Sequence, residues 1–384
     1  MADPVNRRRF LEIGTLGVGY SALASHAGAT QSNQSTANRV RMIGDGLGLS
    51  PKELADTWTE LATNGQIEPD SYSNGGAVEQ LEKACATVLG KERAIFMPTG
   101  TLANHLAVRE LAAGPGRAVV QAESHLYNDS GDCVQTLSNM PLVALGPNQA
   151  SFSIEQLETA VERADTGRVA TPIRVISIET PVRRRFGETF DANELERVVS
   201  FAKQREIRLH LDGARIFLQA AYENKPVSDY TAPFDTVYVS LYKYFNAPSG
   251  AILAGPRSLL DGMFHTRRMF GAGLPAAWPF AALAHHYLPG FTDRFRQAVD
   301  TAETWTGLIS DHEAFSVERI NNGTNLFRLQ VTGTDPLLFR TKLERADVVV
   351  GRPTGTGQFL IAVNETWNRR PADEMAAVFV EALS

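Results

Sequence analysis

The chain has 384 residues, of which 43% are hydrophobic and 21% are charged. These proportions are ordinary for a globular enzyme, and the length suits one large domain with a smaller one. The formal net charge of −6 gives no electrostatic reason to expect a nucleic-acid partner. Cys85 and Cys133 occur without CxxC or Cys/His spacing, so no zinc site is implied and no metal ligand is assigned.

The first residues have the order of an export signal. Three arginines at 7–9 precede a weakly apolar run that continues to about residue 24, and small residues follow at 27–29. The spacing RRxFL resembles a bacterial twin-arginine signal. We predict a signal peptide at 1–29, a polar linker at 30–40, and a periplasmic or extracellular protein with no membrane contact after cleavage. The alternative is a disordered basic tail.

Two helices are predicted next. The segment 51–63 begins with Ser50 as the cap and Pro51 at the first helical position. An amphipathic helix follows at 77–89 and is stopped by Gly90. The glycine-rich segment before them, at 41–50, would cradle a phosphate or simply form turns.

From residue 93 the pattern alternates between strands and helices. Short apolar segments predict seven strands, at 93–98, 118–123, 142–146, 175–179, 209–214, 236–241 and 250–255. Helical patterns at 99–114, 153–164 and 191–206 lie between them. This alternation is typical of βαβ units around a mostly parallel sheet, so the fold class is α/β.

The pattern changes after about residue 289. Strands are predicted at 325–331, 346–350 and 358–363, and a final helix from Pro371. We therefore predict that 41–290 form an N-terminal segment and a large domain, and that 291–384 form a small C-terminal domain.

Lys243 lies between two apolar segments that both read as buried strands. A lysine in such a place is costly unless it is paired, exposed or chemically used. Taken alone it would be a loop lysine that points into water. Asp212, however, closes another apolar strand about thirty residues upstream. A lysine and an aspartate at the ends of neighbouring strands suggest pyridoxal 5′-phosphate, with a Schiff base on Lys243 and a pyridine nitrogen protonated by Asp212.

Other candidate site residues also follow strands. Thr99, Gly100 and Thr101 would place backbone N–H groups at a helix N-terminus, which favours a phosphate, although a threonine-capped helix with nothing bound fits as well. His125 would stack on the pyridine ring. Arg215 would bind a substrate carboxylate or brace the cofactor. Ligands of open α/β sheets bind at the carboxyl ends of the strands, where these residues are predicted to meet.

Residues 65–290 resemble the threonine aldolase and β-eliminating lyase family of fold-type I enzymes. The resemblance is carried by EQLEKACATVLGKERAIFMPTGTLAN, ESHLY, HLDGAR, APFDTVYVSLYK and APSGAILAG. It implies the aspartate-aminotransferase-like fold, with a mostly parallel seven-stranded sheet in a large domain and a small α+β domain. It also implies pyridoxal phosphate on Lys243 and a homodimer or homotetramer with shared active sites. Tyr72 falls where the family has a tyrosine that approaches the neighbouring site and its substrate.

The chain departs from the family at substrate-binding positions. The family's Ser-Asp-Thr-Val-Thr segment is replaced by GDGLGLS, its Gly-Leu-Gly-Ala-Pro by YFNAPSG, and its Gly-Gly-Gly-Met-Arg-Gln by GAGLPAA. Phe359 aligns with the arginine that binds the substrate carboxylate near the C-terminus. Arg183, Arg184 and Arg185 follow a strand and are alternatives for that role, unless they form a solvated turn.

The resemblance implies cleavage of the Cα–Cβ bond of a β-hydroxy-α-amino acid to glycine and an aldehyde. In this reading Lys243, Asp212 and His125 are the catalytic residues, and His125 or a water that it holds takes the β-hydroxyl proton. The alternatives are β-elimination, transamination of another amino acid, and a non-catalytic protein that keeps the cofactor fold.

Overall fold

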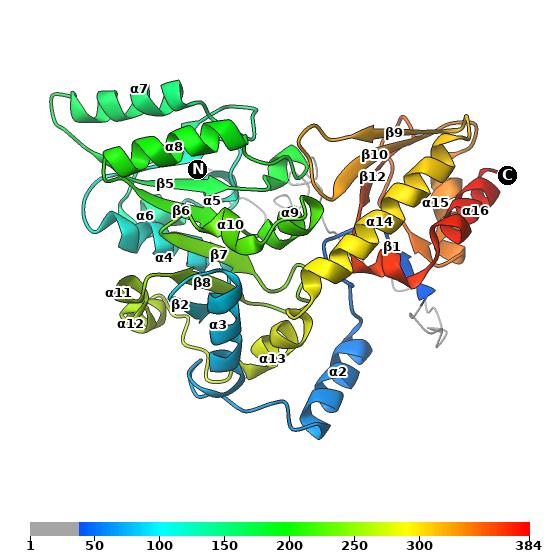
Figure 1. Cartoon of the computed structure of the whole chain (residues 1–384), viewed down its shortest axis with the longest axis horizontal. Coiled ribbons are helices and arrows are strands. Elements are labelled where there is room, and N and C mark those ends of the chain that lie inside the picture. The colour runs from blue at the N-terminus through cyan, green and yellow to red at the C-terminus, as the bar shows by residue number, and fades with distance from the viewer. Residues whose placement is uncertain (1–37) are drawn as a thin grey trace, which may run out of the picture. The chain divides into compact units, whose positions relative to one another are not determined.

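The computed structural model describes residues 38–384, so the predicted signal peptide and most of the linker lie outside the described residues. Figure 1 shows two groups of strands, each with its own helices. The strands are β1 (Val40–Arg41), β2 (Arg93–Met97), β3 (Arg117–Gln121), β4 (Leu142–Leu145), β5 (Ile173–Glu179), β6 (Arg208–Asp212), β7 (Thr236–Ser240), β8 (Ala251–Gly255), β9 (Phe315–Arg319), β10 (Leu326–Val331), β11 (Val348–Val349) and β12 (Gln358–Ala362).

The helices include all those that the sequence predicts, together with several short ones after strands. They are α2 (Pro51–Thr63), α3 (Gly76–Val88), α4 (Gly100–Ala112), α5 (His125–Asn128), α6 (Cys133–Ser138), α7 (Ile154–Asp165), η2 (Arg183–Arg185), α8 (Ala192–Gln204), α9 (Ile216–Tyr222), α10 (Val227–Thr231), α11 (Arg257–Leu260), α12 (Met263–Met269), α13 (Trp278–Tyr287), α14 (Phe291–Ser310), α15 (Pro336–Arg345), η3 (Glu365–Arg369) and α16 (Ala372–Leu383). None in the described part is long and apolar enough to cross a membrane.

Local chemistry fixes the start of α2 as predicted. The Ser50 side chain accepts a hydrogen bond from Glu53 N, and the Glu53 carboxylate accepts one from Ser50 N. Pro51 occupies the first helical position, where its missing N–H leaves no hydrogen bond unmade.

The larger sheet has seven strands in the order β2-β8-β7-β6-β5-β3-β4. Strand β8 is antiparallel to both neighbours, and the other pairs are parallel. The predicted α/β fold with a mostly parallel seven-stranded sheet is confirmed. Since β2, β7, β6, β5, β3 and β4 run the same way, their carboxyl ends lie on one edge.

Helices cover both faces of this sheet, as Figure 1 shows. Alternate residues of β3 divide between the two layers, with Val119 in one apolar cluster and Val120 in another. The first cluster also contains side chains of α3, α7 and α8, whereas the second contains side chains of α4 and α6. Strands buried on both faces explain why the predicted strands were continuous apolar runs.

The C-terminal part has its own core around a three-stranded antiparallel sheet, β12-β10-β9. Trp305 and Trp367 pack edge to face in this core, with 5.3 Å between their ring centroids. Strand β1 pairs in parallel with β11, so the start of the described chain packs with its C-terminal part. Helix α14 joins the cores, because Phe291 belongs to the larger cluster and Trp305 to the smaller.

Candidate active site

Four strand ends bring the predicted site residues together. Asp212 is the last residue of β6 and lies opposite Tyr238 of β7 in the sheet register. Lys243 follows β7, His125 begins α5 after β3, and Thr99 lies between β2 and α4. These positions are the carboxyl ends of parallel strands, where the sequence places the site.

Lys243 has the properties of a reactive amine. Burial, together with the nearby charge of Arg215, lowers its pKa to about 8, although the charges of Asp212 and Asp45 oppose the change. The Nζ atom lies 4.8 Å from the ring centroid of Tyr242 and 5.9 Å from that of Tyr238. Within residues 38–384 it makes no hydrogen bond or ion pair. The amine is therefore available for covalent chemistry near neutral pH.

The carboxylate of Asp212 is held by a buried polar chain. Its Oδ2 accepts a hydrogen bond of 2.5 Å from Asn104 Nδ2, and the Asn104 Oδ1 lies 2.9 Å from His210 Nε2. Burial lowers the pKa of His210 to about 4, so the ring is neutral and its Nε2–H donates to Asn104. The Nδ1 atom of His210 then accepts a hydrogen bond from the Thr236 hydroxyl, with 2.8 Å between Nδ1 and Oγ1. The sequence alone gives no sign of a role for Asn104 or His210, because their contacts join segments that are distant along the chain.

The start of α4 leaves backbone N–H groups without partners in the helix. Thr99 caps the helix by accepting a 3.2 Å hydrogen bond from Leu102 N. Gly100 and Thr101 lie in the first turn, whose N–H groups have no partner within the helix. A Cβ atom on Gly100 would lie 2.0 Å from the hydroxyl of Tyr238, so only glycine fits there.

His125 is fixed by a carboxylate that the sequence analysis missed. The buried Glu179, at the end of β5, accepts hydrogen bonds from His125 N at 2.6 Å and Arg183 N at 2.9 Å. Burial, aided by the charge of Asp212, raises the pKa of Glu179 to about 7. Burial lowers the pKa of His125, so its imidazole is neutral at pH 7. Its Nδ1 lies 3.3 Å from Ser130 Oγ.

Arg215 is paired with a residue of the glycine-rich loop. Both its Nε and its Nη2 lie 2.9 Å from Asp45 Oδ2, and both side chains are largely buried. The loop reaches the site closely, since a Cβ atom on Gly46 would lie 2.2 Å from the Lys243 carbonyl oxygen. Asp45 binds one side of the guanidinium, and Nη1 makes no hydrogen bond within residues 38–384. The segment 41–50 therefore supplies a carboxylate that orients Arg215.

Two other predicted positions lie elsewhere. Tyr72 is 43% exposed at the surface, with the guanidinium of Arg268 4.9 Å from its ring centroid. Phe359 is buried in the smaller core, 5.8 Å from the ring of Phe339. Its neighbours on β12 that face the other side, Gln358 and Leu360, carry no charge. This strand segment therefore offers no cation for a carboxylate.

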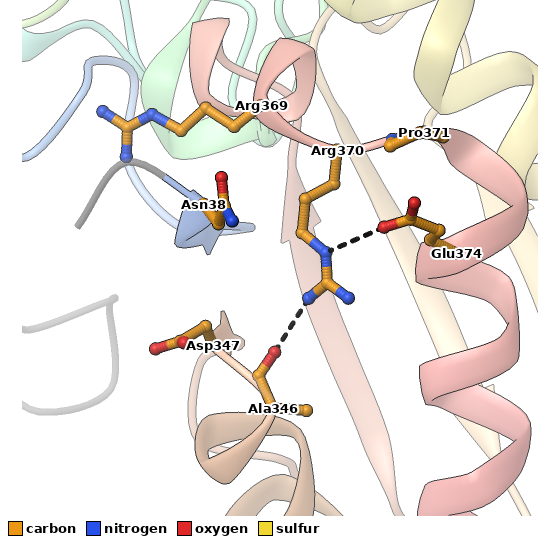
Figure 2. Close-up of a pocket in the computed structure, with 7 residues that line it drawn as sticks. All are labelled: Asn38, Ala346, Asp347, Arg369, Arg370, Pro371 and Glu374. Carbon is orange, nitrogen blue, oxygen red and sulfur yellow. Dashed lines mark hydrogen bonds and ion pairs between the residues drawn. The ribbon is translucent and has the colours of Figure 1, made fainter. Parts of the chain in front are cut away.

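A pocket of about 480 Å³ lies between Asn38, the end of α15 and the start of α16 (Figure 2). Its Arg370 is already engaged, because Nη1 donates to Ala346 O at 2.8 Å and Nε lies 3.8 Å from Glu374. None of its lining residues is a candidate site residue.

Comparisons with known proteins give the family of this chain and its fold relatives. Residues 57–332 match the model of the Beta-eliminating lyase family. A low-specificity L-threonine aldolase of Saccharomyces cerevisiae is 27% identical over 59% of this chain and 58% of its own length. The alanine racemase TOXG of Cochliobolus carbonum is 30% identical over 57% of this chain and 56% of its own length. The alignments thus span little more than half the length of these two relatives.

The fold comparison covers more of the chain. The crystal structure of a putative aromatic amino acid β-eliminating lyase/threonine aldolase from Exiguobacterium has a TM-score of 0.75 and 23% identity, over 91% of this chain and 98% of that one. At this identity the likeness establishes the fold. Because the family model spans most of the sequence, from 57 to 332, the chain belongs to the Beta-eliminating lyase family.

Proposed function

We propose that the protein is a pyridoxal-phosphate-dependent aldehyde lyase, which cleaves the Cα–Cβ bond of a β-hydroxy-α-amino acid to glycine and an aldehyde. The observation that carries the proposal is the placement of two residues at the ends of the adjacent strands β6 and β7. They are a buried aspartate, Asp212, and a lysine of lowered pKa, Lys243. The aldolase relative supports the choice of substrate class.

The residues present fit this cofactor. Lys243 would hold it covalently, Asp212 would face its ring nitrogen, His125 would lie on its ring, and the first turn of α4 would hold its phosphate. When bound, the cofactor supplies an electron sink conjugated with the substrate Cα. The hydrogen bond from Asn104 and the buried surroundings keep the Asp212 carboxylate fixed, so it stabilises a proton on that nitrogen.

His125 is the candidate base, acting directly or through a water. Its imidazole is neutral because burial lowers its pKa, so it can accept the β-hydroxyl proton at pH 7. Glu179 holds its backbone N–H and so fixes the start of α5. Arg215 would bind the substrate carboxylate through the edge that Asp45 leaves open.

An absorption titration tests the proposal. The purified protein should bind added pyridoxal phosphate and become yellow, and β-hydroxy-α-amino acids should then change the visible spectrum. A protein that ignores the cofactor would contradict the proposal. Interconversion of alanine enantiomers without glycine formation would instead favour the reaction for which TOXG is named.

Arg215→Lys should raise KM strongly for amino acids and leave the cofactor spectrum nearly unchanged. Lysine has no planar fork, so it cannot contact Asp45 and a carboxylate together. We expect a loss of about 2–4 kcal/mol in binding, as when a charged hydrogen-bonded partner is spoiled. The measurement is KM by steady-state kinetics, with Arg185→Lys as a control, because Arg185 pairs with Glu188. Loss of the cofactor itself would mean that Arg215 braces pyridoxal phosphate.

The active sites are proposed to be shared between subunits of a homodimer or homotetramer. The exposed ring of Tyr72, which extends from the loop before α3, would then approach the site of a neighbouring subunit. This arrangement would account for a predicted substrate-binding residue that lies at the surface of its own chain.

The protein is further proposed to be exported by the twin-arginine pathway, with cleavage near Ala29. Replacing Arg7 and Arg8 with lysine should leave the uncleaved protein in the cytoplasm of a host that has this pathway. Cell fractionation and N-terminal sequencing measure the outcome. Export that is unchanged by the substitution, or a mature protein that still begins at Met1, would contradict the leader assignment.

A further inference from the structure

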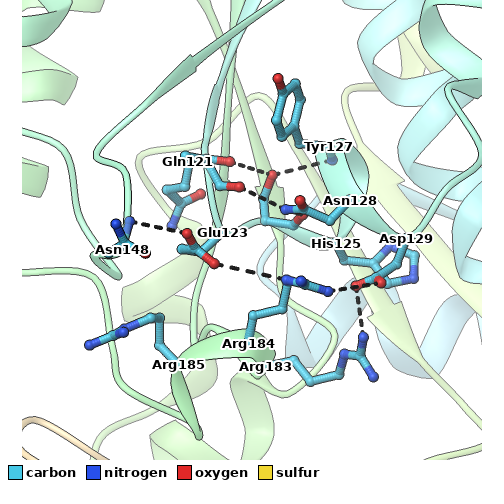
Figure 3. Close-up of polar contacts among 12 residues, drawn as sticks. Gln121, Glu123, His125, Tyr127, Asn128, Asp129, Asn148, Arg183, Arg184 and Arg185 are labelled. Carbon is cyan, nitrogen blue, oxygen red and sulfur yellow. Dashed lines mark hydrogen bonds and ion pairs between the residues drawn. The ribbon is translucent and has the colours of Figure 1, made fainter. Parts of the chain in front are cut away.

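Three consecutive arginines form η2 after β5, and Figure 3 shows that two of them, Arg183 and Arg184, contact Asp129. Arg185 pairs with Glu188 at 3.2 Å, within its own segment. Arg184 lies 3.3 Å from one oxygen of Asp129 and 3.8 Å from Glu123. Arg183 lies 2.7 Å from the other oxygen of Asp129. These residues are therefore not equivalent members of a basic turn.

Arg183 is attached to the catalytic base through Glu179. One oxygen of the buried Glu179 carboxylate accepts the N–H of Arg183, and the other accepts the N–H of His125. The two main-chain segments are thus held on one carboxylate. Burial is the main cause that lowers the pKa of His125, and the charge of Arg183 acts in the same direction.

The ion pair of Arg183 can open at low cost. Its side chain is 43% exposed and contacts Asp129 through Nη2. Asp129 is also bound by Arg184, so it would keep a cationic partner if Arg183 turned away. Removing one of two partners avoids the penalty of leaving a carboxylate unpaired. Arg183 is therefore a cation that is positioned at the site and still available to a ligand.

We propose that Arg183 binds an anionic group on the Cβ substituent, so that the preferred substrates are β-hydroxy-α-amino acids with a second carboxylate. The inference rests on the proposed function, in which His125 receives the β-hydroxyl proton and hence lies on the Cβ side of the substrate. Arg183, whose N–H is held on the same carboxylate as that of His125, would then contact what Cβ carries. Arg215 remains for the α-carboxylate, because it follows β6 and is paired with Asp45 rather than with Asp129.

The reaction balances without another reactant. The β-hydroxyl proton moves to the base, the C–O bond becomes a carbonyl, and the Cα–Cβ bond breaks. Its electron pair remains with Cα, which takes up a proton. The products are glycine and an oxo acid, whose carboxylate Arg183 would hold until release.

The test compares kcat/KM for 3-hydroxyaspartate and threonine in the cofactor-loaded protein. Arg183→Gln should lower the ratio of the two values by about 10- to 100-fold, as expected for a lost charge-assisted hydrogen bond. Arg183→Lys keeps the charge and should recover part of the ratio. Arg184→Gln removes the other partner of Asp129 and should leave the ratio within about threefold of wild type.

Binding provides a second readout. Spectral titration with aspartate and with alanine compares ligands that differ by the second carboxylate, and Arg183→Gln should weaken aspartate selectively. Equal losses for both ligands, or a ratio that responds to Arg184→Gln as strongly as to Arg183→Gln, would overturn the role of Arg183 alone. A wild-type protein that cleaves neither amino acid would overturn the proposed function and this inference with it.

Discussion

Lys243→Ala is expected to lower turnover on the order of 10⁴-fold or more, because no other lysine among residues 38–384 follows a strand at this edge of the sheet to hold the cofactor covalently or to return a proton to Cα. The wild-type lysine is suited to both tasks, since burial lowers its pKa to about 8. Borohydride reduction followed by peptide mapping should find the cofactor fixed on Lys243 in the wild type. In the variant the phosphate-anchored cofactor should remain exchangeable.

Lys225→Ala is the matched control, because Lys225 is exposed and pairs with Glu223 at the surface. It should keep wild-type activity and labelling. Undiminished turnover of Lys243→Ala, or a reduced adduct on another lysine, would show that the lysine is misassigned.

Asp212→Asn is expected to raise the barrier by roughly several kcal/mol, because a neutral amide cannot hold a proton on the ring nitrogen. The loss should appear in kcat, with cofactor occupancy largely retained. Asn104 already donates to Asp212, and its amide would face another amide in the variant, so the surrounding chain also loses its charged acceptor. Steady-state kinetics and the cofactor spectrum measure the two effects separately.

Asp235→Asn provides the comparison. Asp235 also accepts a backbone N–H, from Leu209 at 2.7 Å, but it precedes β7 rather than following β6. A charge lost at this other edge should leave the barrier unchanged. If Asp212→Asn turns over at the wild-type rate, Asp212 does not act on the cofactor.

The sequence predicts the larger sheet well because its strands are buried on both faces and therefore read as short apolar runs. Strand β9 was missed for the opposite reason, since only its first residue is buried. The two-residue strand β1 was missed because it is too short for a period to show, whereas the two-residue β11 lies within the strand predicted at 346–350. The predicted site residues could be located because they follow strands of the same direction, which end at one edge.

Contacts between distant residues lie beyond such patterns. Arg215 and Asp45 are 170 positions apart, and Asn104 and Asp212 are 108 apart. Glu179 ends a predicted strand, but its role depends on the N–H groups of two loops that only the fold brings together. Phe359 shows a further limit, because alignment gives a position in β12 but not the face on which the side chain lies.

Product analysis with the cofactor-loaded wild-type protein tests the proposed lyase reaction most directly. β-Hydroxy-α-amino acids, including threonine and 3-hydroxyaspartate, would be incubated with it, and glycine and the carbonyl product would be quantified together. A pyridoxal-phosphate-dependent aldehyde lyase should form the two products in equal amounts, and only with bound pyridoxal phosphate. Amino acid consumed with release of ammonia and without glycine, or no consumption of any of these substrates, would contradict the proposed reaction.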